Sequence, residues 1–216
     1  MKELIRRTVR EERGDALLFF LFIVPLILSL ILWRMDYSQA VTHTEIDFTE
    51  GLKKAVKAAA NQVTERSQAE GDPRIDSDRA HAAFRAILAD NLKLDSGSMA
   101  PINNSPLKSP VKYTLVVYNG DDNYIASGAK AVYQYDFDGN TLSSYPLSGS
   151  GFPQQFTVTD SGIAYGTGGT FDVVLDAPGC VAVAEVDLKT ITDTPAKPVR
   201  WASTKIHNRS EEGSND

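Results

Sequence analysis

The residues best suited to chemistry are carboxylates beside predicted turns. The stretch 136–140 (DFDGN) alternates carboxylate and amide groups, as calcium-binding loops do. An EF-hand loop has glycine at its sixth position and glutamate at its twelfth, whereas here glycine is fourth and Leu147 is twelfth. We therefore interpret the stretch as a β-hairpin with Asp138-Gly139 at its tip. A site that assembles around Asp136 and Asp138 on folding is the enzymatic alternative.

Other candidate groups are dispersed along the chain. The carboxylates within residues 72–78 are explained by capping of a helix and by contact with solvent in a loop. The glycine cluster 166–169 has no helix after it, which argues against a phosphate loop. Three histidines fall in different segments without metal-ligand spacing, and we expect each to be exposed: His43, His81 and His207. These observations predict no enzymatic activity, no cofactor and no metal site.

The single cysteine, Cys180, lies at the start of a β-like run. One cysteine excludes an intrachain disulfide. A cysteine in such a run behaves as a small apolar residue, so we expect a buried structural thiol.

An apolar run near the N-terminus decides the class of protein. Residues 16–33 (ALLFFLFIVPLILSLILW) form eighteen positions without a charge. At about 1.5 Å per residue this length covers roughly 27 Å as a helix, close to the ~30 Å hydrocarbon core of a bilayer. A core helix would show a polar stripe, and a cleavable signal would have a shorter apolar core and small residues after it. The run therefore predicts a retained transmembrane helix with a kink at Pro25.

The charges on either side of the run predict its orientation. Five basic residues precede it, whereas Arg34 alone follows it beside Asp36. The positive-inside bias therefore places the N-terminus in the cytoplasm and the rest of the chain outside the cell. Residues 36–216 carry more acidic than basic side chains, which argues against nucleic acid as a partner. Membrane lipid is the first partner we predict.

Beyond the run, apolar spacing predicts two helices. Residues 37–68 continue with helical spacing, with at most a break at 42–44 and a weak point at Gly51. A second helix is predicted from a cap at Ser77 or Asp78 to Leu92. The apolar stripe of the first helix comprises Ile46, Leu52, Val56, Ala59, Ala60 and Val63.

The second half of the chain has the pattern of an antiparallel sheet. Short β-branched or aromatic runs occur at 112–118, 131–137, 156–159, 170–175 and 180–188, with Asn119-Gly120 and Asp138-Gly139 as hairpin turns. The predicted fold class is α+β, with a small antiparallel sheet or sandwich. The predicted organisation is a cytoplasmic basic leader (1–14), a transmembrane helix (15–35), an extracellular helical region (36–94), a linker (95–110), a β-rich domain (111–207) and a disordered tail (208–216).

The N-terminal region resembles a known family. A basic leader ends in Arg13-Gly14, an apolar run has Pro25 eleven residues after the glycine, and Asp36-Tyr37 precedes an alanine-rich helix. This arrangement, over about residues 6–65, resembles the TadE/TadG-like pseudopilins of tight-adherence type IV pilus systems. The resemblance implies cleavage between Gly14 and Asp15 by a prepilin peptidase, and other pilin or pseudopilin subunits as partners. Phe19 stands where such proteins usually carry a glutamate.

The layout and the resemblance together give the expected function. We expect a non-catalytic, single-pass membrane pseudopilin or minor pilus component that acts through helix packing and β-domain contacts. Phe19 and Pro25 are the candidate positions for packing between transmembrane helices. The alternative is a membrane-tethered extracellular adhesion or binding module unrelated to pili.

Overall fold

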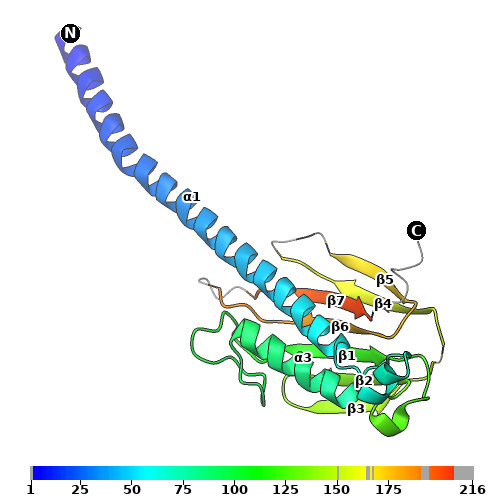
Figure 1. The fold of residues 1–216 in the computed structure, drawn as a ribbon. Coiled ribbons are helices and arrows are strands. Elements are labelled where there is room, and N and C mark those ends of the chain that lie inside the picture. Colours follow the sequence, from blue (N-terminus) through cyan, green and yellow to red (C-terminus); the bar gives the residue numbers. More distant parts are fainter. Residues whose placement is uncertain (1, 150, 164–165, 167, 191–194, 207–216) are drawn as a thin grey trace, which may run out of the picture. The chain divides into compact units, whose positions relative to one another are not determined.

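The chain forms two compact units, Met1–Ala40 and Val41–Asp216. A computed structural model describes residues 2–149, 151–163, 166, 168–190 and 195–206, with the backbone alone for 2–18, 35–37 and 39–40. One helix, α1 (Lys2–Ala60), contributes to both units (Figure 1).

The first unit consists of the N-terminal part of α1. Pro25 lies inside this helix. Among the residues that the structure describes, no helix carries a run both long enough and apolar enough to cross a membrane. The transmembrane helix predicted at 15–35 lies partly outside the described side chains, which begin at Phe19.

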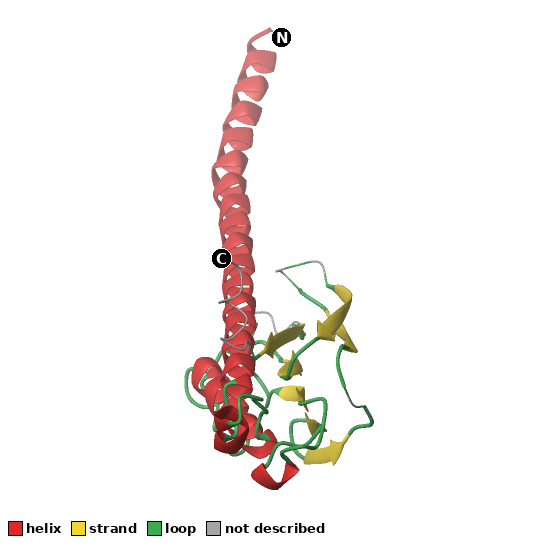
Figure 2. Cartoon of the chain, turned by 45° about the vertical axis from the view of Figure 1, so that its right-hand side comes forward, coloured by secondary structure: helices red, strands yellow, loops and turns green. Residues whose placement is uncertain are grey.

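The second unit begins with the C-terminal part of α1, which is amphipathic. Its buried side chains recur every three or four residues, as expected for one face of a helix. They include Val41, Glu45, Phe48, Leu52, Val56 and Ala59. The short helix α2 (Glu65–Ala69) and the longer α3 (Ser77–Leu92) follow. In Figure 2 the helical segments of this unit lie on one side of its strands.

Gly51 is the point at which α3 approaches α1. A Cβ atom built on Gly51 would lie 3.1 Å from Cβ of Asn91. The glycine that weakens the helix locally is therefore also the residue that allows the two helices to pack closely.

The main sheet has five antiparallel strands in the order β3-β2-β1-β6-β7. Its strands are β1 (Lys112–Tyr118), β2 (Val132–Phe137), β3 (Leu142–Pro146), β6 (Gly179–Glu185) and β7 (Val199–Lys205). Because side chains alternate along each strand, one set faces the helices and the other faces away. Tyr113 belongs to the first set, since its ring packs against Phe84 of α3 with centroids 5.1 Å apart. Thr114 belongs to the second set.

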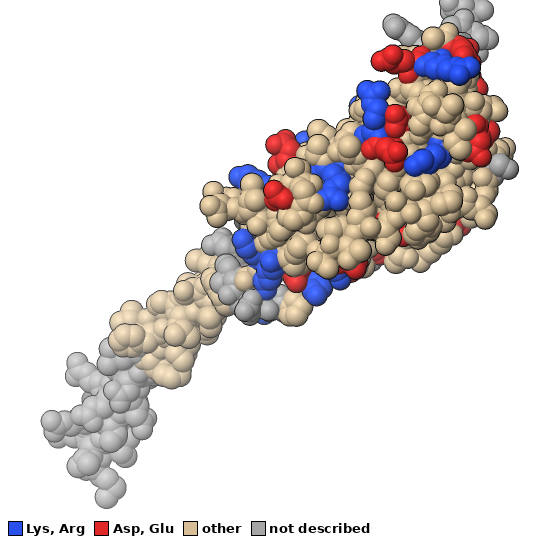
Figure 3. Space-filling view, turned by 90° about the horizontal axis from the view of Figure 1, so that it is seen from below, with Lys and Arg blue, Asp and Glu red and all other residues tan. Residues whose placement is uncertain are grey.

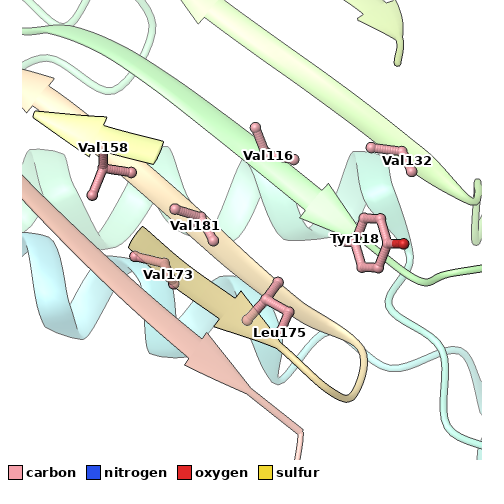
Figure 4. Close-up of a cluster of buried hydrophobic side chains, with 7 residues drawn as sticks. All are labelled: Val116, Tyr118, Val132, Val158, Val173, Leu175 and Val181. Atoms are coloured by element: carbon pink, nitrogen blue, oxygen red, sulfur yellow. The ribbon is translucent and has the colours of Figure 1, made fainter. Parts of the chain in front are cut away.

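A two-stranded sheet, β4 (Gln154–Asp160) and β5 (Gly169–Leu175), covers part of the outer face of the main sheet. Valine and leucine side chains from β4 and β5 meet side chains of β1, β2 and β6 there (Figure 4). The buried members of this second core are Val116, Tyr118, Val132, Val158, Val173, Leu175 and Val181.

The predicted α+β class is confirmed, and several boundaries are corrected. The first helix ends at Ala60 rather than near Gln68, because residues 62–64 pair with 74–76: Thr64 donates to the Arg74 carbonyl at 2.9 Å and Asp76 to the Gln62 carbonyl at 2.7 Å. The cap of α3 is Asp76, whose carboxylate accepts from the backbone of Asp78 and Arg79.

One other segment differs from its prediction. Asn119-Gly120 is not a tight hairpin, since residues 119–131 and the short 3-10 helix η1 (Ile125–Ser127) separate β1 from β2. Residues 95–110, predicted as a linker, form a loop in which Met99 and Leu107 are fully buried. The predicted disordered tail, 208–216, lies outside the described residues.

Candidate functional site

The described side chains of α1 before residue 35 form an apolar surface. From Phe19 to Arg34 every side chain except Ile23 is exposed. Phe22 is 74% exposed and Leu21 is 64% exposed, so large apolar side chains project from the helix surface. In Figure 3 these residues give an almost uncharged surface, while Lys, Arg, Asp and Glu are scattered over the rest of the visible chain.

The residues assigned to processing and packing fall on this helix. Gly14 and Asp15 lie outside the residues whose side chains are described. Phe19 is 61% exposed and its ring meets Phe20 edge-on, with centroids 6.3 Å apart. Pro25 is also exposed.

A second candidate surface is a shallow groove on the outer face of the main sheet. Its volume is about 370 Å³, and it lies on strands β1, β2, β6 and β7. The groove-lining side chains on this face are Lys112, Thr114, Asp136, Val183, Glu185 and Val199, with Asp138 at the end. Glu185 pairs with Lys112 at 3.4 Å across β1 and β6.

Asp136 is held rigidly at the side of this groove. Its carboxylate accepts hydrogen bonds from Thr114 at 2.6 Å, from Gln134 at 2.7 Å and from the Tyr145 hydroxyl. Burial acts to raise the pKa of Asp136, but these hydrogen bonds outweigh it and hold the pKa below its ordinary value. The carboxylate is therefore ionised and preorganised at neutral pH.

Asp138 stabilises the turn of the β2–β3 hairpin, and the predicted turn is confirmed. One carboxylate oxygen accepts from the backbone N–H groups of Asn140 at 2.8 Å and Thr141 at 2.7 Å. Gly139 has φ +97°, the left-handed conformation that glycine adopts without strain. One of the two carboxylate oxygens of Asp138 is thus committed to the turn.

His81 is buried, contrary to its prediction, whereas His43 is exposed as predicted and His207 lies outside the described residues. The His81 ring stacks on Tyr135 with centroids 4.2 Å apart, and its Nε2 lies 2.7 Å from the Tyr113 hydroxyl. Burial, with the charge of Arg85, lowers the pKa of His81 from 6.5 to about 4. Burial also raises the pKa of Tyr113 to about 12.

A buried ionic cluster joins three elements of the second unit. Arg200 of β7 donates to Glu45 of α1 at 2.6 Å and to Asp160 at the end of β4. The side chain of Glu45 is 0% exposed and that of Arg200 is 5% exposed. Glu45 also accepts from the backbone N–H of Ile163 at 3.0 Å. This cluster ties α1 to both sheets.

Comparisons of the chain with protein-family models, curated proteins and solved structures gave no match. Among the described side chains, no group of three or more His, Cys, Asp and Glu residues is placed to hold a metal ion. The predicted buried thiol of Cys180 is confirmed, and complete burial raises its pKa, which makes it unreactive.

Sequence reasoning found Asp136 and Asp138 but missed their neighbours. Thr114 lies beside Asp136 through the β1–β2 register, and Tyr145 reaches it from a strand that was not predicted. Strand β3 has five exposed residues and therefore lacks the alternation that marks a half-buried strand. The pairing of Glu45 with Arg200 was not predicted, because the two residues lie 155 positions apart and no local pattern links them.

Proposed function

We propose that this chain is a non-catalytic, membrane-anchored subunit: a pseudopilin or minor pilus component of a tight-adherence-like pilus or secretion system. The observation that carries the proposal is α1, one helix of 59 residues with an exposed apolar part and an amphipathic part built into the second unit. The uncharged eighteen-residue run in its sequence supplies the length that a membrane span needs.

The proposal gives each part of the helix a physical role. Before assembly, lipid would surround the apolar side chains, and the N-terminal basic residues would stay in the cytoplasm. After assembly, apolar helices of neighbouring subunits would replace lipid at little cost in free energy, because both surroundings are equally apolar. The α+β unit would remain outside the cell and make the contacts between subunits.

The carboxylates support a structural role rather than an enzymatic one. Asp136 accepts three side-chain hydrogen bonds and Asp138 holds a turn, so both act within the fold. The hydroxyls of Thr114 and Tyr145 donate to the Asp136 carboxylate and link it to the neighbouring strands, an arrangement that favours a structural role.

The groove on the outer sheet face favours a second candidate function. A membrane-tethered adhesion or binding module would use the same anchor, with its N-terminus intact, and would bind a ligand through the α+β unit. The state of the N-terminus separates the two functions.

Intact-mass measurement of the membrane-extracted protein tests the proposal. The wild type is expected to lack residues 1–14, and Gly14→Ala is expected to retain them because the cleavage position is altered. Thr8→Ala, a leader substitution away from the junction, should be processed as the wild type is. A wild type that keeps residues 1–14 and never copurifies with a filament would remove the pilus role and favour the binding module.

A further inference from the structure

We propose that the outer-face groove binds a row of lysines on α1 of a second copy of this chain. The groove is the one around Asp136 and Glu185, and the row consists of Lys53, Lys54 and Lys57. This contact rests on the proposed function, since it is a contact between subunits of one assembly.

The groove suits a long cationic side chain. Its floor includes Val183 and Val199, both half-buried, and its rim carries three carboxylates against one ammonium group. A lysine side chain matches this arrangement, because its aliphatic stem can lie on the valines while its head reaches the carboxylates. An anion would meet a net negative rim and is disfavoured.

The lysine row is exposed and has spare positive charge. Lys53, Lys54 and Lys57 are exposed on α1, on the side away from the buried Leu52 and Val56. Lys53 pairs with Glu50 at 2.8 Å. Within the described part of the chain, Lys54 and Lys57 form no ion pair, so their charges are available to a partner.

The row cannot fill the groove of its own chain. Arg200 points toward α1, as its bond to Glu45 shows, whereas the neighbouring Val199 lines the groove. Adjacent residues of a strand face opposite sides of a sheet, so α1 and the groove lie on opposite faces. Only another copy, or another protein, can bring lysines to the groove.

A second copy carries a complementary surface, because its exposed lysine row opposes the net negative rim of the groove. The groove and the row are different surfaces, so their contact is head-to-tail rather than self-complementary. Repetition of a head-to-tail contact extends an assembly without limit unless it closes into a ring. Such a contact is what a filament subunit requires.

Disulfide cross-linking between two differently tagged full-length chains in the same membranes tests the contact. One chain carries Glu185→Cys and the other Lys57→Cys, while the native Cys180 is buried and stays silent. With an added oxidant, we expect a cross-linked pair that contains both tags. Replacing Lys57→Cys with Arg79→Cys, at an exposed position of α3, should abolish that pair.

The results of this cross-linking test the contact independently of the proposed function. If the chain is membrane-bound and lacks residues 1–14 but the mixed pair does not form, the contact is wrong and the proposed function stands. Cross-linking of Glu185→Cys to a protein of different mass, instead of to the tagged copy, also overturns the contact. A mixed pair formed by chains that retain residues 1–14 supports the contact and removes the pilus role.

Discussion

At the scale of single residues, Asn119 replaces missing backbone pairing at the end of β1. It is fully buried, and its side-chain oxygen accepts from the N–H of Ile75 at 2.7 Å. Its amide group donates to the carbonyls of Ile75 and Lys130, each at 2.9 Å. One side chain thus fixes the segment before α3 and the segment before β2.

Asn119→Ala should lower the free energy of unfolding by about 2–4 kcal/mol, because it leaves several buried backbone groups without partners and each costs roughly 1–3 kcal/mol. Chemical denaturation of the full chain in mild detergent measures the change. Asn123→Ala, at an exposed position of the same loop, is the control and should stay within about 0.5 kcal/mol of the wild type. Equal stability of Asn119→Ala and the wild type would contradict this role.

The lowered pKa of buried His81 predicts that the free energy of unfolding depends on pH. The unfolded chain protonates this residue below its ordinary pKa of 6.5, but the folded chain does so only near 4. Proton binding therefore favours the unfolded state as the pH falls from about 6.5 to about 4, and stability is lost over that window. His81→Gln, which cannot titrate, should lose less stability between about pH 7 and pH 5 than the wild type does. Identical pH profiles of the two proteins would show that His81 is not responsible.

At the scale of elements, the contact between α1 and α3 depends on Gly51. Gly51→Ala should change stability little, because a gain of about 1 kcal/mol in helix propensity is offset by the tight approach to Asn91. Gly51→Leu should destabilise the protein by about 1–3 kcal/mol or more through overpacking. Lys54→Leu adds the same side chain at an exposed position of the same helix and serves as control. A Gly51→Leu protein as stable as the control would rule out close helix packing at this point.

The buried cluster of Glu45, Arg200 and Asp160 holds α1, β7 and β4 together. Arg200→Met should lower the free energy of unfolding by about 3–5 kcal/mol, since it removes the cation that Glu45 and Asp160 share in a largely buried site. Arg79→Met, on the exposed side of α3, should be nearly neutral, and denaturation midpoints of the two variants give the comparison. Similar midpoints would mean that the cluster contributes little.

The sequence predicted the elements whose pattern is local. Strand β1 and the end of α3 agree with their predicted limits, and Asp138-Gly139 forms the predicted turn. The elements that were missed depend on distant partners. Strand β7 gains its pairing from β6, and α1 ends early because Gln62 and Thr64 pair with residues after α2.

The same distinction holds for the candidate site, where residues with a local pattern were predicted and their distant partners were not. Asp136 was visible as a carboxylate, but its hydrogen bonds with Thr114 and Tyr145 depend on strand register, which the sequence does not encode locally. Conversely, His81 was predicted to be exposed because a lone histidine has no local sign of burial, whereas the aromatic residues of β1 and β2 enclose it.

At the scale of the whole molecule, the proposed membrane anchoring depends on where the apolar part of α1 resides. Side chains such as Phe22 and Leu32 are more than half exposed in the isolated chain, and water would be a costly surrounding for so many of them together. Lipid or the helices of neighbouring subunits would remove that cost. Within the second unit, the buried cluster around Arg200 joins α1 to both sheets.

Fractionation of cells that express the full-length chain tests this claim most directly. After lysis without detergent and an alkaline carbonate wash, which strips peripheral proteins, the chain should remain in the membrane pellet and enter solution only when detergent is added. Recovery of the full-length chain in the soluble fraction before detergent would contradict the proposed membrane anchoring.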